Sequence, residues 1–593
     1  MPEIESILVG RELASGALRQ IVSRLLAVDR LEQCLREVLA QGRGRLSFDD
    51  VLRRMEVTVE VCERELERIP AGGPVLVVAN HPFGLLEGPV LGSVLMRRRS
   101  DIKFLANRVL SLAPVVRDYV IPVDVENGAE AVRSNWRSLR EALRWLESGG
   151  LLAVLPAGEV AALRLSPFGV AEPPWGEATG WLARRSGAVT VAVFLEGANG
   201  AGFHLAGLVH PRLRTALLPR EFLNKQGRRV RLSIGPPIPA ERLRRMPAKQ
   251  ASDYLRSCTE ALGAARKPGR IALARLAPKS KPVAPRLPAD LMEREISSLA
   301  PEAQLVESSD QRVYIAQSVQ IPNLLREIGV LREISFRQAQ EGTGRPCDLD
   351  EFDPHYLHLF SWNVNRREVV GAYRLSGTDS RRPLYTRTLF RIDSGFFEQL
   401  GPALELGRSF IQPAYQKSYA ALFLLWRGIG EYVSRNPRYR YLFGPVSISA
   451  AYTKVSRALI AEYLRRRFQS SPLVPLVRPA RRFVPDRRSE IWLERLAREI
   501  ADLDELSQIV SALEPDGKGI PVLLRHYLQL GTEVLEFSVD PGFSGVVDGL
   551  IVLDLLGVKP ATLARYLGRA AARGYLAHHG REFSMEAAGP GAA

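Results

Sequence analysis

The stretch Val77-Val78-Ala79-Asn80-His81-Pro82-Phe83-Gly84-Leu85-Leu86-Glu87-Gly88-Pro89 decides how the first half of the chain folds. The apolar run Val75 to Ala79 predicts a buried strand that ends in an Asn-His-Pro turn, and an apolar helix follows Gly88-Pro89. A histidine needs a carboxylate partner to hold its tautomer if its other ring nitrogen is to take a proton from an alcohol. His81 and Glu87 are such a pair, mounted at the rigid end of a strand. The alternative is a histidine that only caps the following helix.

Beyond this stretch, short apolar segments alternate with amphipathic ones. The pattern predicts strands at 75–80, 102–106, 118–123, 151–155 and 189–195, and helices at 88–98, 130–148 and 175–186. Such alternation is typical of an α/β fold with a largely parallel sheet, whose functional residues gather at the carboxyl ends of the strands. Three further blocks fall at such ends: Lys103 to Arg108, Leu155 to Glu159, and Val189 to Gly197.

In this order and at these intervals, the four blocks resemble the glycerolipid and lysophospholipid acyltransferase family over roughly residues 70–245. The resemblance implies that His81 is the general base for O-acyl transfer and that Glu87 orients it. The family commonly has four residues between the histidine and its acid, whereas this chain has five. The residues that the resemblance places at the acceptor are Asn80, Asn107, Arg108, Gly158 and Glu159.

The third block departs from the family pattern in a way that affects the substrate. Ala157 stands where the family usually has a glutamate, and Val160 where it has an arginine. Without that arginine, a bidentate grip on a phosphate is missing. The departure favours an acceptor with a less charged headgroup, such as the carboxylate of an amino-acid lipid.

The second half of the chain has a different pattern. It predicts a helix at 321–340, an acidic loop from Asp348 to Asp353, strands at 357–363, 368–375, 385–392 and 404–410, and a helix at 420–434. This layout resembles the GNAT superfamily of N-acyltransferases. Where that superfamily has its pyrophosphate loop, Gln416-Lys417-Ser418-Tyr419-Ala420-Ala421 has a tyrosine in place of the central glycine. The change favours a donor carried on acyl carrier protein over coenzyme A.

More specifically, residues 310–555 resemble the ornithine-lipid N-acyltransferases. The segments that carry this resemblance are Leu404 to Phe410, Gly444 to Ser449, Ile520 to Leu528, Asp540-Pro541 and Asp548 to Val552. We expect Glu405 to accept the surplus proton of the attacking amine, and Arg408 and Ser409 to bind substrate. Three residues apart on a strand, Glu405 and Arg408 face opposite sides unless a bulge at Gly407 realigns them. The alternative is a structural ion pair near the strand end.

Length and composition set the domain organisation. The 593 residues suggest two to four domains, and the 46% apolar and 25% charged fractions are those of a folded globular protein. We divide the chain into a helical region (1–70), an O-acyltransferase domain (71–263), a Pro-rich basic linker (264–290) and a GNAT-like N-acyltransferase domain (291–585). The fold class is therefore α/β, with two acyltransferase domains.

The net charge of +16 favours anionic partners, which are lipid headgroups, nucleic acid or acidic carrier proteins. No aromatic-basic motif supports nucleic acid. A basic amphipathic helix predicted over 11–42 either lies on an anionic membrane or packs on its own domain. The N-terminus lacks a signal pattern, and no apolar run approaches the roughly 18 residues of a spanning helix. We therefore expect a cytoplasmic protein, peripheral on the inner face of the cell membrane.

No metal or cofactor is expected beyond acyl carrier protein or coenzyme A as the carrier of the acyl donor. His355 and His358 are spaced as metal ligands can be, but they lack acidic or cysteine partners at helical offsets. The four cysteines lie far apart and suit neither a zinc ribbon nor a disulfide framework.

The combination of the two domains resembles the bifunctional ornithine lipid synthases of bacteria. It implies that the C-terminal domain acylates the amine of ornithine, or a similar amino acid, with a 3-hydroxyacyl chain, and that the N-terminal domain then esterifies the new hydroxyl of this lyso-lipid. One alternative is a glycerolipid or lysophospholipid acyltransferase whose second half only binds carrier or lipid. Another is a hemolysin-like membrane-binding protein without catalysis, although such a protein has no use for His81 beside an acid.

Overall fold

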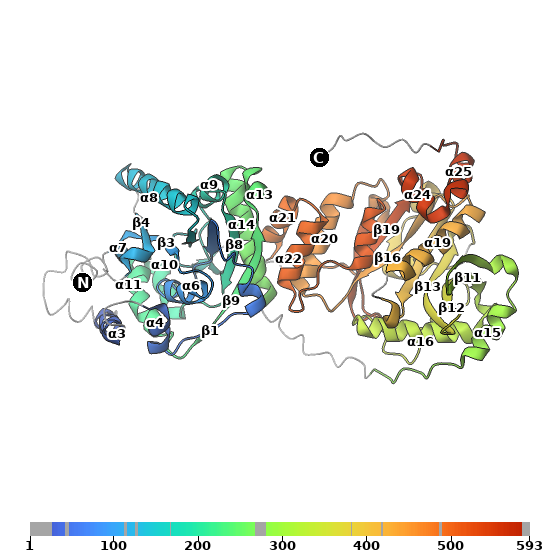
Figure 1. The fold of residues 1–593 in the computed structure, drawn as a ribbon, viewed down its shortest axis with the longest axis horizontal. Coiled ribbons are helices and arrows are strands. Elements are labelled where there is room, and N and C mark those ends of the chain that lie inside the picture. The colour runs from blue at the N-terminus through green and yellow to red at the C-terminus, as the bar shows by residue number, and fades with distance from the viewer. Residues whose placement is uncertain are drawn as a thin grey trace. The chain divides into compact units, whose positions relative to one another are not determined.

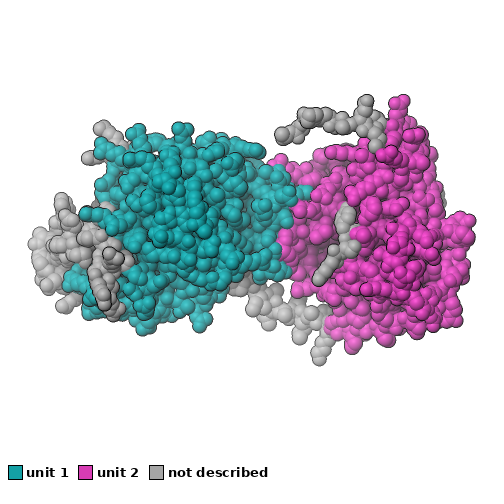
Figure 2. All heavy atoms as spheres, in the orientation of Figure 1, with its two compact units in different colours: residues 1–267, 488–517 teal, residues 268–487, 518–593 magenta. Residues whose placement is uncertain are grey.

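The computed structural model describes residues 27–41, 47–111, 116–124, 129–165, 168–266, 280–380, 382–416, 419–485 and 489–583. The chain forms two compact units, which Figure 2 colours separately. Unit 1 comprises residues 1–267 and 488–517, and unit 2 comprises residues 268–487 and 518–593. Each unit is built on its own central sheet.

The sheet of unit 1 has the strand order β1-β9-β8-β2-β5-β3-β4. Its strands are β1 (Thr58–Glu60), β2 (Val75–Ala79), β3 (Ile102–Asn107), β4 (Val120–Val123), β5 (Leu151–Val154), β8 (Val189–Leu195) and β9 (Arg229–Ile238). Figure 1 labels five of these strands, β1, β3, β4, β8 and β9. From β8 to β4 all neighbours run parallel, whereas β9 is antiparallel to β8. Every residue of β2 and β5 is buried, as unbroken aliphatic runs in a doubly covered parallel sheet require. The predicted α/β fold is confirmed.

Helices and one hairpin complete unit 1. They are α3 (Val28–Gln41), α4 (Phe48–Arg54), α5 (Glu63–Leu66), α6 (Glu87–Met96), α7 (Arg108–Ser111), α8 (Ala129–Glu147), hairpin strands β6 (Ala162–Leu165) and β7 (Phe168–Ala171), α9 (Glu177–Arg185), α10 (Ala201–Val209), α11 (Pro211–Ala216), α12 (Leu218–Leu223), α13 (Ala240–Arg244) and α14 (Ala248–Arg266). The helices predicted at 88–98, 130–148 and 175–186 are confirmed as α6, α8 and α9. Residues 11–26 of the basic amphipathic helix lie outside the described residues; α3, its described part, packs on α4 and α12 and buries Cys34 and Val38.

The described part of residues 1–70 is not a separate helical region. Cys34, Val38 and Phe48 belong to the same apolar core as β2. A short strand, β1, also lies inside the segment predicted to be helical and pairs in parallel with β9. Its sequence Thr58-Val59-Glu60 carries two β-branched residues, which favour a strand over a helix.

The prediction that residues 291–585 form one domain is wrong for residues 488–517. Helices α21 (Glu490–Glu499) and α22 (Leu503–Leu513) belong to unit 1. Helix α21 packs along α14 and buries Trp492, Leu493 and Leu496, while α22 contacts β9 and α14. Amphipathic helices need an apolar partner surface, and these two find it in unit 1 although their sequence lies inside the second half of the chain.

Unit 2 is built on an eight-stranded sheet of order β10-β11-β12-β13-β15-β16-β19-β18. The strands are β10 (Gln304–Ser308), β11 (Gln311–Gln317), β12 (Leu357–Asn363), β13 (Glu368–Gly377), β15 (Ala403–Ile411), β16 (Tyr441–Ile448), β18 (Glu533–Asp540) and β19 (Val546–Asp554). Only β15 and β16 are parallel, and they pair over Ala403–Glu405 and Tyr441–Phe443 alone. Strands β15 and β16 therefore part immediately after Glu405.

The helices of unit 2 are α15 (Ala289–Ser297), α16 (Pro322–Gln338), α17 (Thr386–Leu389), α18 (Ser394–Leu400), α19 (Tyr419–Arg435), α20 (Lys454–Phe468), α23 (Val522–Gln529), α24 (Pro560–Leu567) and α25 (Arg569–His578). Helices α16 and α19 and strands β12, β13 and β15 confirm the predicted elements. The strand predicted at 385–392 is wrong for its first half, which forms α17. Its second half, β14 (Phe390–Ile392), pairs with β17 (Val477–Pro479) in a separate two-stranded sheet.

The predicted linker is also shorter than 264–290. Residues up to Arg266 complete α14, and residues 267–279 lie outside the described residues. From Lys281 the backbone is bound to unit 2, because the Lys281 and Ala284 N–H groups donate to the carbonyls of Gly344 and Pro346. No helix in the described ranges is long and apolar enough to cross a bilayer.

Candidate active sites

The candidate site of unit 1 is the loop that joins β2 to α6. His81 leaves the end of β2, and its Nδ1 lies 2.9 Å from Oε1 of Glu87, the first residue of α6. The same oxygen accepts the backbone N–H groups of Phe83 (2.6 Å) and Gly84 (2.9 Å). The predicted pair is thus in contact despite the additional residue between its members, because the turn bends back onto the carboxylate. With Nδ1–H donating to Glu87, the Nε2 atom of His81 remains a proton acceptor.

The electrostatics of the pair favour a proton on the imidazole. Glu87 is fully buried, and the His81 side chain is 13% exposed. Burial opposes the charged imidazolium, but the adjacent Glu87 carboxylate outweighs it and raises the pKa of His81. Burial likewise opposes ionisation of Glu87, but His81 and the two backbone donors lower its pKa, and the amino end of α6 favours negative charge. His81 is therefore a stronger base than a free histidine.

The neighbouring strand β5 brings the third sequence block to the same place. The N–H of Ala161 donates to the His81 carbonyl over 2.9 Å. Glu172, which the sequence analysis did not single out, accepts the backbone N–H of His81 and the indole N–H of Trp175 (3.1 Å). Burial raises the pKa of Glu172. No motif marks this acid, because it lies 91 residues from its partner.

The remaining predicted acceptor-binding residues have partners within the protein. The Asn80 amide bridges to the backbone N–H and carbonyl of Leu195 (2.7 and 3.0 Å), so it ties β2 to β8. Arg108, at the end of β3, pairs with Asp124 and Ser134. Glu159 binds Arg214 over 2.8 Å, and the neighbouring Gly158 has a φ of +66°. Asn107 ends β3, which is separated from β2 by β5 in the sheet. All lie at the carboxyl edge of one sheet.

We expect Glu87→Gln to move the acid limb of the pH–rate profile for acyl transfer by unit 1. Only neutral His81 can accept a proton, so the wild-type rate rises as pH increases through a pKa above 6.5. Removing the carboxylate charge lowers that pKa, and the limb moves to lower pH while the plateau rate falls. The measurement is kcat/KM between about pH 5 and about pH 9. An unmoved limb with a normal plateau would show that another acid orients His81.

The candidate site of unit 2 centres on Glu405 of β15. Its carboxylate is 1% exposed and accepts hydrogen bonds from the Thr386 backbone N–H (2.7 Å), the Thr386 hydroxyl and the Tyr356 hydroxyl. Tyr356 in turn accepts the backbone N–H of Tyr385 (2.9 Å). Burial raises the pKa of Glu405 and makes it a better proton acceptor than a free glutamate.

Arg408 is brought towards the same region by a bulge. In the pairing of β13 with β15, the single residue Tyr373 lies opposite two residues, Arg408 and Ser409, which defines a β-bulge. The backbone of Arg408 has a φ of +47°. The bulge therefore lies one residue after the predicted Gly407. Arg408 forms ion pairs with Asp348 (3.5 Å) and Asp350 (3.4 Å) and not with Glu405. Ser409 interacts with the paired hydroxyls of Tyr373 and Tyr527.

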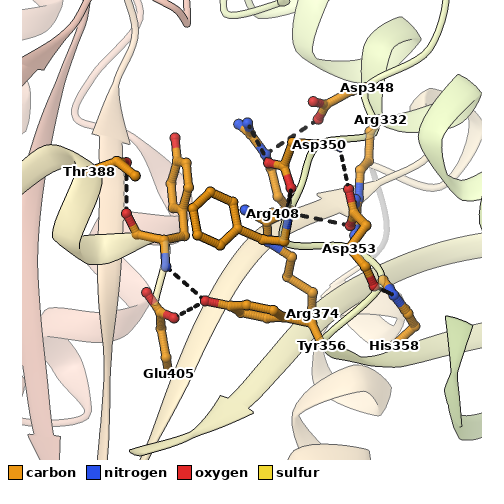
Figure 3. A network of polar contacts seen from close by, with 12 residues as sticks. Arg332, Asp348, Asp350, Asp353, Tyr356, His358, Arg374, Thr388, Glu405 and Arg408 are labelled. Carbon is orange, nitrogen blue, oxygen red and sulfur yellow. Dashed lines mark hydrogen bonds and ion pairs between the residues drawn. The ribbon is translucent and has the colours of Figure 1, made fainter. Parts of the chain in front are cut away.

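Glu405 and Arg408 border a buried network of charges that Figure 3 shows from close by. The guanidinium carbon of Arg374 lies 5.0 Å from the ring centroid of Tyr356 and 4.9 Å from that of Tyr385. Its Nη1 atom forms ion pairs with Asp350 (2.7 Å) and Asp353 (3.4 Å). Arg332 pairs with Asp353 over 2.7 Å. The side chains of Arg332 and Arg374 have no solvent exposure, and their Nε and Nη2 atoms have no hydrogen-bond partner among the described residues.

Sequence reasoning missed most of this network. Asp348, Asp350 and Asp353 were assigned to an acidic loop, and Arg332, Tyr356 and Arg374 were not singled out. One signal was available: Arg374 is a lone charge inside the apolar strand Val369–Leu375, and a buried charge requires partners. The partners of Arg374 are Asp350 and Asp353 of the acidic loop, and the other arginines of the network come from α16 and β15. No sequence spacing connects these elements.

No metal site was expected, and His358 has another role. Burial lowers its pKa to about 4, and its Nε2–H donates to the Asp353 carbonyl over 2.9 Å. Among the described residues, no group of three or more His, Cys, Asp or Glu is arranged to hold a metal. Of the predicted pyrophosphate loop, residues 417–418 lie outside the described residues.

Comparisons with known proteins match the two halves of the chain to different protein families. Residues 7–266 match the family model described as "Acyltransferase", and residues 331–427 match the "Acetyltransferase (GNAT) domain" model. Two similar proteins are both named glycine N(alpha)-acyltransferase. That of Bacteroides thetaiotaomicron is 35% identical over 29% of this chain and 58% of its own length. That of Phocaeicola vulgatus is 29% identical over 41% of this chain and 80% of its own length.

The chain thus spans less than two thirds of the first of these relatives. The crystal structure of the 1-acyl-sn-glycerophosphate acyltransferase PlsC from Thermotoga maritima is 18% identical and covers 42% of this chain and 95% of that one. The TM-score of this match is 0.24.

The chain therefore combines an N-terminal acyltransferase domain with a C-terminal GNAT-type domain, as the sequence motifs predicted.

Proposed function

We propose that this chain makes a diacylated aminolipid by two acyl transfers. Unit 2 transfers a 3-hydroxyacyl chain to the amine of an amino acid, and unit 1 then esterifies the new hydroxyl. The observation that carries the proposal is that each unit holds its own buried proton acceptor. This acceptor is His81 with Glu87 in unit 1 and Glu405 in unit 2.

In unit 1, the hydroxyl of the lyso-lipid would donate its proton to Nε2 of His81 as its oxygen attacks the thioester carbonyl. The imidazolium that forms is stabilised by Glu87, 2.9 Å from Nδ1. Collapse of the tetrahedral intermediate breaks the carbon–sulfur bond, and the proton returns from His81 to the leaving thiolate. The products are the ester and the free thiol of the carrier.

In unit 2, the amine must be neutral to attack a thioester. The pKa of a free amino acid's α-amine lies above the roughly 7.7–8.0 of a peptide α-amino group, so only a small minority is deprotonated at neutral pH. Glu405 would accept the surplus proton of the attacking nitrogen, directly or through water. Collapse of the tetrahedral intermediate would then break the carbon–sulfur bond, and the leaving thiolate would take up a proton to give the amide and the free thiol of the carrier. The surrounding network contains three arginines and several carboxylates, which supplies partners for both ends of a zwitterionic amino acid. The unpartnered nitrogens of Arg374 support binding of the amino acid carboxylate.

The acceptor and the donor are part of the proposal. The sequence resemblance favours ornithine, whereas two similar proteins are named for glycine. The donor is proposed to be acyl carrier protein, an acidic partner that suits the net charge of +16. The enzyme would work in the cytoplasm, peripherally on the inner face of the membrane that receives its product.

The test uses the full chain, because cutting at the linker would remove α21 and α22 from unit 1. Purified protein is incubated with 3-hydroxyacyl carrier protein or 3-hydroxyacyl coenzyme A and with either glycine or ornithine, and products are read by mass spectrometry. We expect an N-acyl amino acid first and its O-acylated form after a second acyl donor is added. Acylation of lysophospholipid without any N-acyl product would replace the proposal with a glycerolipid acyltransferase.

We expect Glu405→Gln to abolish most N-acyl transfer while the chain stays folded. The amide keeps the shape of the side chain but cannot accept the proton of the amine, and loss of a general base costs about 10²–10⁴-fold in rate. The matched control is Glu398→Gln, an exposed glutamate of the same unit. N-acyl transfer by Glu405→Gln at the control's rate would leave Glu405 a structural residue that holds Tyr356 and Thr386.

A further inference from the structure

An exposed apolar surface lies on α10 and α11 of unit 1. Four large apolar side chains are at least 45% exposed there: Leu205 (59%), Leu208 (45%), Val209 (78%) and Leu213 (48%). In the described part of the chain, twelve large apolar side chains are exposed, and these four fall within nine residues. Positions 205, 208 and 209 share one face of α10, since residues three and four apart on a helix are neighbours. Scattered exposed apolar residues are ordinary, whereas a cluster of this kind marks an interaction site.

The elements that carry this surface also hold the His81 loop. Two residues before α10, the Asn199 amide donates to the Phe83 carbonyl over 2.9 Å. In α11, Arg214 binds Glu159 over 2.8 Å. Leu218, at the start of α12, lies so close to Gly84 that an added Cβ would come within 2.4 Å of its Cδ2. The exposed surface therefore lies next to residues that contact the loop between His81 and Glu87, Asn199 by a hydrogen bond and Leu218 by packing.

The segment that carries the surface is basic in sequence. Residues 201–220 contain Arg212, Arg214 and Arg220 and no aspartate or glutamate. Arg220 is exposed, whereas Arg214 is paired with Glu159. Apolar side chains that enter the acyl boundary, with arginines beside them, are the pattern of a segment that lies in the interface of an anionic bilayer.

We propose that α10 and α11 form the surface by which unit 1 docks on an anionic phospholipid bilayer, with Leu205, Leu208, Val209 and Leu213 inserted among the lipids. The proposal rests on the proposed function and deepens it. It places the bilayer, from which a lyso-lipid acceptor would come, next to the segments that contact the loop between His81 and Glu87. It also locates membrane contact away from α3, whose buried face packs on its own domain.

The test measures binding of the full chain to vesicles without any acyl donor. Vesicles contain either phosphatidylglycerol with phosphatidylethanolamine or phosphatidylcholine alone, and bound protein is read by co-sedimentation. We expect binding to the anionic vesicles, and a loss of at least about tenfold in partition coefficient for Leu208→Asp with Val209→Asp. The matched control is Val319→Asp in unit 2, whose side chain is 79% exposed against 78% for Val209. It should bind as the wild type does.

Three outcomes would overturn the proposal. The first is equal binding by the double variant and the control, and the second is equal binding of the wild type to both vesicle types. The third is a wild-type dimer in sedimentation velocity that is absent from the double variant, which would assign the surface to a second copy of the chain. A thermal melt checks that both variants fold, which is expected because the substituted side chains are exposed. Since no acyl transfer is measured, a failure of the proposed chemistry leaves this result unaffected.

Discussion

His81→Ala should reduce O-acyl transfer by about 10²–10⁴-fold while N-acyl transfer continues. Incubated with both acyl donors, the variant should therefore accumulate the mono-acylated N-acyl amino acid. The reason is that Nε2 of His81 is the proton acceptor left free by the 2.9 Å contact between Nδ1 and Glu87. The measurement is the ratio of mono-acylated to diacylated product by mass spectrometry.

The control for this experiment is His578→Ala, because His578 is an exposed histidine of unit 2. It should give the wild-type ratio of products. A normal yield of diacylated lipid from His81→Ala would remove His81 from the mechanism. Loss of both products would point to misfolding, which hydrogen exchange of the β2 peptide would detect, and Glu87→Gln then provides the gentler test of the same site.

Asp353→Ala should destabilise unit 2 by about 3–5 kcal/mol, because it leaves two buried arginines without their shared partner. Arg332 lies 2.7 Å and Arg374 3.4 Å from Asp353, and neither guanidinium is exposed. Hydrogen–deuterium exchange of β12 and β13 peptides measures this loss separately from unit 1. The control is Glu431→Ala, which breaks the partly exposed Glu431–Arg435 pair and should cost under about 1 kcal/mol.

The pH dependence of the stability of unit 2 gives a second test of the role of Asp353. Burial opposes ionisation of Asp353, but Arg332 and Arg374 outweigh it and hold its pKa well below the ordinary 3.8. Its stabilisation is therefore present above about pH 4 and is lost as pH falls towards the folded pKa. Asp353→Ala should lack this part of the acid dependence. Exchange rates equal to those of the control at neutral pH would show that Arg332 and Arg374 find other partners.

The structure around β2 could be predicted from sequence because its signals are local. A fully buried parallel strand requires an unbroken aliphatic run, and Val75 to Ala79 supplies one. His81 and Glu87 lie within one turn of the chain, so their contact needs no knowledge of other elements. The α/β alternation and both domain classes follow from patterns of the same short range. Glu405, likewise, sits on a strand that its own sequence predicts.

The tertiary structure alone decided which distant residues share a site or a unit. Glu172 reaches His81 from 91 residues away, and Arg332, Asp353 and Arg374 meet from a helix, a loop and a strand. Helices α21 and α22 show apolar faces in their sequence, but a face does not specify its partner. Any apolar surface would bury them, and unit 1 offers α14. Sequence by itself therefore determined the local elements and the His81–Glu87 pair. Long-range packing decided the rest, because apolar burial is non-directional and a buried charge pairs with whichever partner the fold brings near.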